Sequence, residues 1–527
     1  MKKNAIILAA GASNKFAPFT YEKPKGLFRV RGEVLIERQI EQLLAAGIQE
    51  VYVVVGFMKE KYFYLERKYG VKLLINNTYQ TKGNIYSLYV ARAYLGNTYI
   101  CCADQYFAEN PFLEDVDYSY RACIKSKEKL HEFTVEVSDC DVITDFYTGK
   151  AHEVCMVGHA YFNETFSKKF VHYMEVEIDD FGVSKLFWEE FYARHQKKLT
   201  LYAKYYGVGE IQEFESVEDL RRFDKDFLDN IDSAIVKNIC KVLRCSPNDV
   251  KEITVIQKGL TNASFKFTVN NLEYVYRHPG GTSSNLVDRK SEYWTQYKAL
   301  ELGIDKSLLY MDEEGWKISY YIGNLVESNL DEERQLQDAM EYLRRLHQVE
   351  YDKEVKCFDT FAEAEKLMRI ACFSKGDLFQ EFAELHQKVG RLDKFLKNDG
   401  VGKNRLCHND TYAPNYLVTL DGEMYLIDWE YAGINDPAND IGCILCRENY
   451  SDARINHYLE VYFGRELTKE EYRHYVSYIA VSGFYWFCWG LYKGAVNDDD
   501  GFFFLPAYRN CERFIDVALD MYLHGGK

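Results

Sequence analysis

The segment from Leu406 to Asn415, and the apolar run that ends at Asp428, constrain this chain more than any other feature. They place a His-x-Asp at His408 and Asp410, an asparagine five residues later, and a second aspartate 13 residues beyond it. Phosphoryl transfer needs a carboxylate beside the attacking hydroxyl, and oxygen ligands that hold Mg²⁺ against the ATP phosphates. Asp410 can be that carboxylate, and Asn415 and Asp428 can be the metal ligands. A turn before a hairpin strand would explain the His-x-Asp, but not the two residues that follow at these distances.

Three neighbouring motifs resemble the choline/ethanolamine kinase branch of the aminoglycoside-phosphotransferase-like kinases; they span residues 408–415, 427–433 and 436–442. The resemblance implies a bilobal, protein-kinase-like α+β domain. It also implies nucleotide-binding residues in a phosphate-covering hairpin, at a basic position on a strand, and at the acidic partner of that base: Gly259, Asn262, Arg277 and Glu292. A charge-assisted hydrogen bond to the glutamate would hold the base in place. By itself, the Gly-Leu-Thr-Asn at 259–262 fits any hairpin turn.

An aromatic stripe between residues 484 and 492 has the spacing of one helical face. It resembles the Trp-x-x-Trp helix that walls the choline site in this kinase family. A quaternary ammonium group cannot donate a hydrogen bond, and an aromatic face stabilises it by about 0.5–2 kcal/mol per ring. A buried seam between two helices is the alternative explanation. The substrate-binding residues that the resemblance implies are Glu430, Tyr450, Trp486, Trp489, Tyr492 and Tyr508.

The chain begins with a second, independent pattern. An apolar run from Ala5 to Ala10 leads into a loop of small residues, and basic residues follow. Backbone N–H groups of such a loop can approach phosphates. The Met-Lys-Lys start and the Ala-Gly-Ala at 10–12 could also belong to a signal peptide, but the apolar run is only about eight residues long.

This opening resembles the sugar-phosphate nucleotidyltransferases, and in particular the bacterial phosphocholine cytidylyltransferases. The resemblance implies a Rossmann-like α/β domain, with catalytic roles for Lys15 and Lys25. Lys15 stands where the family usually has arginine, so the charge is kept but the two-pronged hydrogen bonding is lost. The implied nucleotide-binding residues are Ala10, Gly11, Ser13, Asn84 and Ser87.

Acidic residues at two places in this region are candidate metal ligands. Asp104 follows an apolar strand, at the end where an α/β sheet exposes such ligands. Glu213 and Glu215 stand at the second acidic site of the family, which usually reads Glu-x-Asp, and either glutamate can be the ligand. Trp188 is a candidate wall for the cation of the substrate. Each acidic pair alone would also fit a helix cap or a solvated face.

Length and composition agree with two domains, which we predict at residues 1–230 and 231–527. The net charge of −16 argues against a nucleic-acid partner. No apolar run approaches the roughly 20 residues of a membrane-spanning helix. The 14 cysteines, without a signal peptide, favour reduced thiols and a cytoplasmic location. Cys443 and Cys446 have the spacing of a redox or zinc motif, but their apolar setting favours a buried helix.

The two implied activities are consecutive. We expect choline and ATP to give phosphocholine, and phosphocholine and CTP then to give CDP-choline and pyrophosphate, with Mg²⁺ as the cofactor at both sites. Ethanolamine or another small amino alcohol is the alternative substrate. A further alternative is that one domain is a non-catalytic nucleotide sensor. Oligomer formation is possible, and no membrane insertion is expected.

Overall fold

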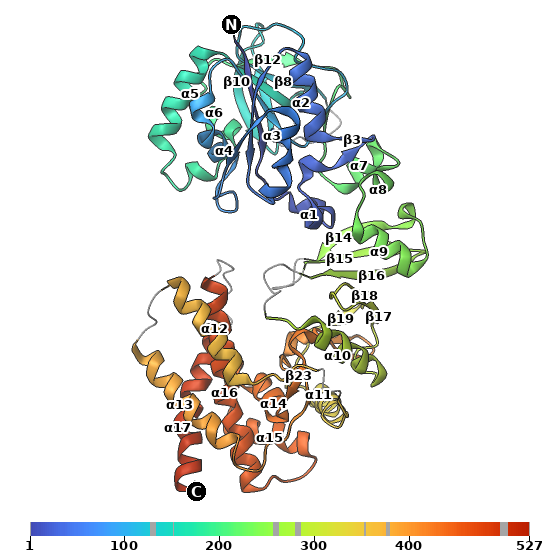
Figure 1. Cartoon of the computed structure of the whole chain (residues 1–527), viewed down its shortest axis with the longest axis vertical. Coiled ribbons are helices and arrows are strands. Elements are labelled where there is room, and N and C mark those ends of the chain that lie inside the picture. Colours follow the sequence, from blue (N-terminus) through green and yellow to red (C-terminus); the bar gives the residue numbers. More distant parts are fainter. Residues whose placement is uncertain are drawn as a thin grey trace. The chain divides into compact units, whose positions relative to one another are not determined.

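A computed structural model of the chain divides into two compact units (Figure 1). Unit 1 comprises residues 1–256 and 267–271, and unit 2 comprises residues 257–266 and 272–527. The predicted domain boundary at residue 230 stays a prediction. Gly259 and Asn262 lie outside the described residues. The structure describes residues 2–126, 133–150, 152–256, 263–279, 286–351, 355–375, 380–495 and 504–525.

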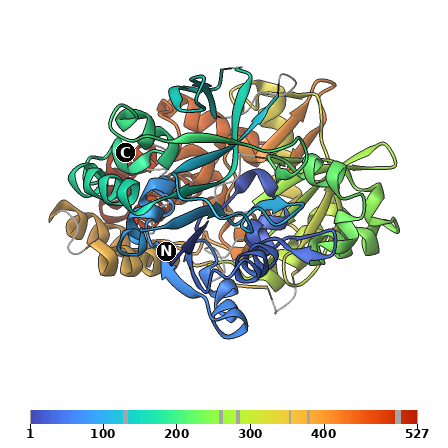
Figure 2. The same cartoon turned by 90° about the horizontal axis from the view of Figure 1, so that it is seen from above.

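Unit 1 is built on a nine-stranded sheet with a parallel centre. Strand β1 (Asn4–Ala9) pairs in parallel with β4 (Glu50–Val55) and with β6 (Thr98–Cys102), and β4 pairs in parallel with β5 (Lys72–Ile75). Figure 2 shows the molecule from above, with the early strands of this sheet in blue and its later strands in teal. The central strands are buried on both faces, which explains why their sequences are continuous apolar runs without alternation.

Strand β11 (Val154–Phe162) pairs antiparallel with β6 on one side and with two later strands, Tyr120–Lys125 and Phe133–Val137. It thereby extends the sheet beyond its parallel part. A separate pair, β7 with β13, is antiparallel. The other strands of unit 1 are β2 (Arg29–Val30), β3 (Glu33–Val34), β7 (Gln105–Phe107), β8 (Tyr120–Lys125), β9 (Phe133–Val137), β10 (Ile143–Thr148), β12 (Tyr202–Tyr205), β13 (Ile211–Glu213) and β14 (Lys251–Ile256).

Helices cover both faces of the sheet (Figure 1). α2 (Leu35–Ala45) and α3 (Tyr64–Tyr69) contribute to the core on one face. α4 (Asn84–Val90), α5 (Glu164–Glu177) and α6 (Trp188–His195) contribute to the core on the other. This layering confirms the predicted Rossmann-like α/β fold. The remaining α-helices of unit 1 are α1 (Phe19–Glu22), α7 (Val217–Phe223), α8 (Phe227–Asn230) and α9 (Ala234–Leu243).

Unit 2 begins with a small antiparallel sheet in which β16 (Leu272–His278) pairs with β18 (Lys317–Tyr320), and β18 with β17 (Leu308–Met311). α10 (Arg289–Glu301) lies between β16 and β17 in the chain. The hairpin of β21 (Tyr416–Thr419) and β22 (Met424–Leu426) belongs to the second part of this unit. The remaining strands are β19 (Leu325–Val326), β20 (Arg405–Cys407), β23 (Gly433–Asn435) and β15 (Ala263–Val269), whose residues are divided between the two units.

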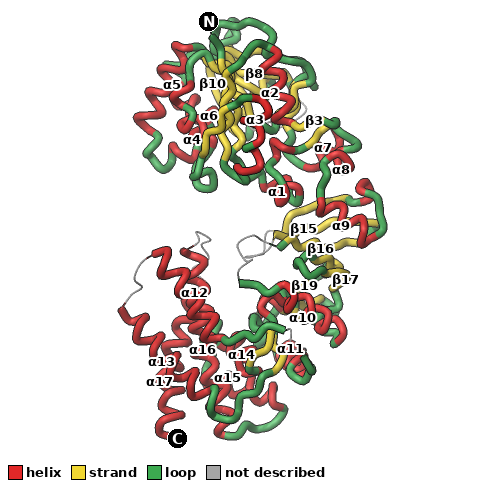
Figure 3. Tube along the Cα trace, viewed as in Figure 1, coloured by secondary structure: helices red, strands yellow, loops and turns green. Residues whose placement is uncertain are grey.

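Helices form most of unit 2 after residue 330, as the sequence predicts (Figure 3). They share one large apolar core with the strands β20, β21 and β22, and the His-x-Asp lies in the loop between the first two. A Cβ atom on Gly442 of α14 would lie 2.5 Å from Ser482 Oγ on α16, so a glycine is required where these helices meet. The predicted α+β character of this region is confirmed. The helices are α11 (Glu333–Leu346), α12 (Thr360–Lys375), α13 (Gln380–Leu396), α14 (Pro437–Leu445), α15 (Asp452–Phe463), α16 (Lys469–Ala495) and α17 (Leu505–His524).

Among the described helices, none combines the length and the apolar character that crossing a membrane requires.

Candidate active sites

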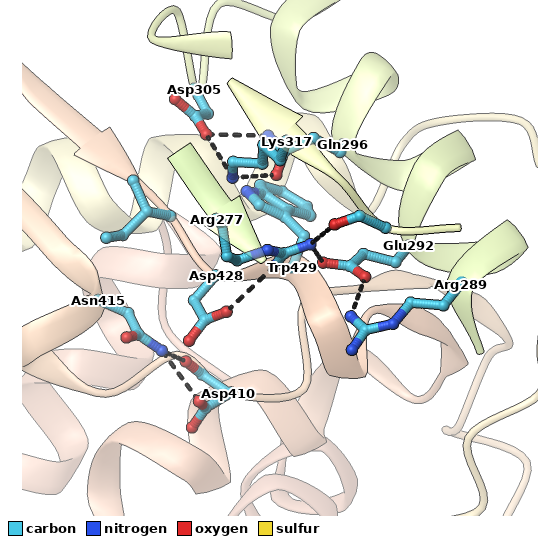
Figure 4. Close-up of polar contacts among 12 residues, drawn as sticks. Arg277, Arg289, Glu292, Gln296, Asp305, Lys317, Asp410, Asn415, Asp428 and Trp429 are labelled. Carbon is cyan, nitrogen blue, oxygen red and sulfur yellow. Dashed lines mark hydrogen bonds and ion pairs between the residues drawn. The ribbon is translucent and has the colours of Figure 1, made fainter. Parts of the chain in front are cut away.

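Asp410 lies in the loop between β20 and β21, where Asn415 holds it from one side (Figure 4). Asn415 Nδ2 donates to Asp410 Oδ2 at 3.0 Å and to the Asp410 backbone oxygen at 2.8 Å. The Asp410 backbone N–H donates to His408 Nδ1 at 3.2 Å. Because the Asn415 amide nitrogen is used in this way, its carbonyl oxygen is the atom that it offers to a cation.

Asp440, in the first turn of α14, fixes the backbone of this loop through hydrogen bonds. Its two carboxylate oxygens accept the backbone N–H groups of His408 at 2.9 Å and Asn409 at 2.7 Å. His347 Nε2 lies 3.0 Å from one of these oxygens, and Asp440 is fully buried. Asp440, His347 and Cys407 lie close enough together to hold a metal ion. Both carboxylate oxygens of Asp440 already accept hydrogen bonds from the loop backbone. We therefore interpret these three residues as a structural hydrogen-bond network.

Asp428 and Arg277 form the opposite side of this site (Figure 4). Asp428 has a left-handed backbone with φ of 68°, and its Oδ1 lies 3.9 Å from Arg277 Nη1. Arg277 also forms an ion pair with Oε1 of Glu292. The other carboxylate oxygen of Glu292, Oε2, lies 2.6 Å from Arg289 Nη1. Burial alone would lower the pKa of Arg277, but Glu292, Asp428 and Glu430 together raise it. The guanidinium group is therefore permanently charged where it faces Asp428.

A second buried network, which no sequence pattern predicts, fixes the strand beside Arg277. Lys317 stands opposite Arg277 in the pairing of β16 with β18. Lys317 Nζ donates to Gln296 Oε1 at 2.8 Å, and Gln296 Nε2 donates to Asp305 Oδ2 at 2.8 Å (Figure 4). These bonds connect β18 to α10, the helix that carries Glu292.

In unit 1, Lys25 and Asp104 meet at one edge of the sheet. Lys25 Nζ lies 2.9 Å from Asp104 Oδ2, donates to the backbone oxygen of Phe214, and stands 4.0 Å from the centre of the Phe16 ring. The loop of residues 10–13 follows β1, and Asp104 follows β6. Since these neighbouring strands are parallel, both features lie at the carboxyl edge, where such sheets bind ligands.

The two candidate glutamates differ in their surroundings. Glu213 Oε1 accepts from the backbone N–H of Gly158 and from Gln105 Nε2, each at 2.8 Å. Burial raises the pKa of Glu213, and the charge of Asp104 adds to this rise, so the two carboxylates lie close enough to interact. Glu215 is exposed. This proximity favours Glu213 as the partner of Asp104, and the ligand assignment stays a prediction.

Asn84 contacts Trp188, whose side chain is buried in the core. Asn84 Oδ1 accepts the backbone N–H of Trp188 at 2.7 Å. The Trp188 side chain is 2% exposed, and its ring lies 5.4 Å from that of Phe162. The guanidinium carbon of Arg121 lies 5.5 Å from the same indole. A protein cation therefore already lies near the ring that we predict to face the substrate.

The other predicted nucleotide contacts of unit 1 lie close to β1. Ala10 follows that strand directly, and its carbonyl oxygen accepts the N–H of Phe57 at 3.0 Å. Ser13 has a left-handed backbone with φ of 51°. Gly11 and Lys15 are exposed. Ser87 is buried and accepts a hydrogen bond from Asn76 Nδ2 at 3.1 Å, so its hydroxyl is part of the core.

Comparison with known proteins identifies both parts of the chain. Residues 5–122 match the family model of the MobA-like NTP transferase domain, and residues 253–480 match that of choline/ethanolamine kinase. A choline-phosphate cytidylyltransferase of Streptococcus pneumoniae is 31% identical over 225 residues, which are 42% of this chain and 96% of that protein. A 2-aminoethylphosphonate cytidylyltransferase of Lancefieldella rimae is 33% identical over 233 residues, which are 43% of this chain and 94% of that protein.

This chain joins a cytidylyltransferase domain to a choline/ethanolamine kinase domain. Both family predictions and the prediction of a fusion are thereby confirmed. The kinase domain is 27% identical over 215 residues to Protein LicA of Haemophilus influenzae, covering 39% of this chain and 60% of that protein. Among solved structures, the choline kinase LicA of Streptococcus pneumoniae aligns with 54% of this chain and 100% of its own, at 20% identity and a TM-score of 0.46.

In the kinase domain, Trp486 and Trp489 lie side by side on α16, with ring centres 5.9 Å apart and both side chains 3% exposed. Trp489 Nε1 donates to the hydroxyl of Tyr431 at 2.9 Å, and Trp486 Nε1 donates to Cys443 Sγ at 3.4 Å. The second bond places Cys443 in the helix core of this domain, as its apolar setting predicts. The two indoles therefore serve the packing of α16 as well as any substrate.

The other predicted substrate-binding residues do not all lie beside the tryptophan pair. Tyr492 is buried on α16 and Glu430 is buried beside Tyr431. Tyr450 packs against Tyr458, with ring centres 5.2 Å apart, and Tyr508 packs against Phe487 at 4.8 Å. The structure brings the tryptophan pair together, whereas these two tyrosines have other aromatic neighbours.

Two basic residues of the kinase site were missed by the sequence reasoning. Arg447 Nη2 lies 3.3 Å from Asp410 Oδ1. Lys493 Nζ lies 5.1 Å from the centre of the Trp489 ring. The spacing of Lys493, four residues after Trp489 on a helix, was a usable signal. Arg447 follows a buried apolar helix, and nothing local in the sequence connects it with Asp410.

Kinase activity is expected to fall as the pH drops through about 7. Burial raises the pKa of Asp410 to about 7; the charge of Asp428 adds to the rise, while Arg447 and Asn415 oppose it. Asp410 must be ionised to accept a proton, so protonation below this pH removes the active form. The pH dependence of kcat/KM for alcohol-dependent ADP release measures this limb. A profile that stays flat down to the ordinary pKa range of aspartate would contradict the assignment.

Proposed function

We propose that the kinase domain phosphorylates a small amino alcohol with ATP, and that the cytidylyltransferase domain couples the product to CMP from CTP. Choline is the first candidate, which makes phosphocholine the intermediate and CDP-choline and pyrophosphate the final products. Ethanolamine is the alternative. The observation that carries the proposal is the presence in one chain of a region that matches choline/ethanolamine kinases and a region that matches NTP transferases. A kinase of that family would make the phosphate that the second domain would consume.

In the first reaction, the alcohol oxygen attacks the γ-phosphorus of ATP, and ADP leaves. Asp410 orients the hydroxyl group and accepts its proton, a role supported by its raised pKa and by the hydrogen bond from Asn415. Arg277 steadies the ATP phosphates, and its ion pair with Glu292 holds it in place. Because phosphoryl transfer depends mainly on positioning and charge stabilisation, these contacts are the ones that matter.

In the second reaction, a phosphate oxygen of the phosphorylated alcohol attacks the α-phosphorus of CTP, and pyrophosphate leaves. Lys25 and Lys15 offset the negative charge of the reacting groups. Two relatives of this domain are named for choline phosphate and for 2-aminoethylphosphonate. Both compounds join a nitrogen-containing group to an anionic phosphorus group, which supports an amino-alcohol phosphate as the substrate here.

A divalent cation fits the oxygen atoms of both sites. We assign Mg²⁺ to Asn415 and Asp428 in the kinase domain, and to Asp104 with Glu213 or Glu215 in the other domain. Amide and carboxylate oxygens are hard ligands of the kind that Mg²⁺ prefers. When bound, the cation neutralises charge on the phosphate oxygens.

The decisive experiment supplies the purified protein with Mg²⁺, ATP, CTP and a panel of alcohols, and identifies the products by mass spectrometry. With ATP alone, choline is expected to give phosphocholine. With CTP alone, supplied phosphocholine is expected to give CDP-choline and pyrophosphate. Propanol, which lacks the nitrogen group, is the control and is expected to remain unchanged. ADP release that does not depend on any amino alcohol would overturn the kinase assignment. If CTP stayed intact in the presence of phosphocholine, the cytidylyltransferase assignment would be overturned.

A further inference from the structure

The guanidinium group of Arg447 occupies the side of Asp410 that faces the aromatic residues. Its carbon lies 3.9 Å from the centre of the Trp486 ring and 4.5 Å from that of Tyr412. Its Nη2 is 3.3 Å from Asp410 Oδ1, whereas Asn415 holds the other oxygen, Oδ2. Arg447 thus stands on the opposite side of Asp410 from the candidate metal ligand.

These are the interactions that an amino alcohol bound for phosphorylation would need. A quaternary ammonium group is best held by an aromatic face, and the hydroxyl group of the same alcohol must reach the carboxylate of Asp410. Two cations cannot share one face of the Trp486 ring, and like charges this close repel each other strongly where water is excluded. The alcohol and the guanidinium group of Arg447 therefore compete for the same ring and the same carboxylate.

The Arg447 guanidinium group has a hydrogen-bond donor that the described residues do not use. Its side chain is 12% exposed, and its buried Nε has no hydrogen-bond partner among the described residues. The next residues along the chain, Glu448 and Asn449, are exposed, so solvent lies close to the backbone of Arg447. A guanidinium group with an unused donor near solvent loses less on leaving than one with every donor satisfied.

We propose that Arg447 occupies the aromatic face and the carboxylate that the amino alcohol requires, and that the alcohol binds by displacing it. Arg447 is then a specificity-determining residue that sets the affinity of the kinase domain for cationic alcohols. This inference rests on the proposed function of that domain. The affinity that is measured for the alcohol is reduced by the fraction of molecules in which Arg447 occupies the ring.

Arg473 provides a matched control on the same helix as the tryptophan pair. Its guanidinium carbon lies 4.3 Å from the ring centre of Tyr522 on α17, and its Nε likewise has no partner among the described residues. An effect that comes only from losing an arginine stacked on an aromatic ring would appear in Arg473→Gln as well.

The test compares Arg447→Gln, Arg447→Lys and Arg473→Gln with the unaltered protein, all with saturating ATP. In Arg447→Gln the KM for choline is expected to fall by about 5- to 30-fold, the size of one lost cation–ring competitor. Arg447→Lys, whose ammonium group stacks less well, is expected to give a smaller fall. The KM for ATP, and all constants of Arg473→Gln, are expected to stay unchanged.

The split between the two Michaelis constants is a readout that a purely structural role would not give. Removal of a competitor lowers the KM for choline alone, whereas a loosened site would raise the KM for choline.

Two results would overturn the inference. One is a KM for choline that is unchanged or higher in both Arg447 variants. The other is a preference of the unaltered protein for alcohols that carry a carboxylate or phosphonate, lost in Arg447→Gln, because Arg447 would then bind an anion. If the unaltered protein phosphorylates no amino alcohol at all, the proposed function itself fails. If it phosphorylates choline but the variants show no lower KM, only the role of Arg447 is wrong.

Discussion

Asp410→Asn is expected to abolish phosphorylation of the alcohol and to leave cytidylyl transfer from CTP to supplied phosphocholine intact. The asparagine keeps the size of the side chain but cannot accept the proton of the hydroxyl group, which costs about 10²–10⁴-fold in rate. Asp410 belongs to unit 2, whereas the residues assigned to cytidylyl transfer belong to unit 1. Separate assays of ADP release and of pyrophosphate release, on the same preparation, measure the two outcomes.

Asp421→Asn is the matched control for this experiment. Asp421 lies exposed in the turn between β21 and β22, in the hairpin that follows the Asp410 loop, and its carboxylate accepts a hydrogen bond from Thr419. The same chemical change there is expected to leave both activities unaltered. If a folded Asp410→Asn protein lost both activities together, the two sites would not be independent.

Asp104→Asn is expected to have the converse effect, with cytidylyl transfer lost and alcohol phosphorylation retained. Asp104 is the carboxylate at the edge of the sheet that pairs with Lys25. Removing its charge takes away both a candidate metal ligand and the partner of a catalytic lysine, with a loss of about 10²–10³-fold expected for one such electrostatic contact. Pyrophosphate release with CTP and phosphocholine is the measurement.

Asp115→Asn is a control of the same kind, because Asp115 forms an ion pair with Lys3 at 2.6 Å but lies on the surface. It is expected to change neither activity, since exposed ion pairs contribute little. CDP-choline formation at the unaltered rate in Asp104→Asn would show that the assignment of this site is wrong.

Local patterns in the sequence predicted both folds and most residues of the two candidate sites. The His-x-Asp, Asn415 and Asp428 lie within one loop and hairpin, so their spacing already implies their proximity. The placement of Asp104 followed from a general rule, since parallel strands expose their carboxyl ends at one edge. Continuous apolar runs predicted buried strands, and the aromatic stripe predicted a helix face. Local patterns of this kind are set by turn chemistry and by periodicity, which are written in neighbouring residues.

Which distant side chains meet could not be predicted from such patterns and became clear from the tertiary packing. Arg447 lies 37 residues from Asp410 in the chain, and His347 lies 93 residues from Asp440, yet both pairs are in contact. The sequence predicted Trp188 as a cation wall, and the structure places it in the core with Arg121 beside it. Such meetings depend on how helices pack and on which way each side chain then points. No short segment encodes this, because the packing arises from contacts between elements that are far apart in sequence.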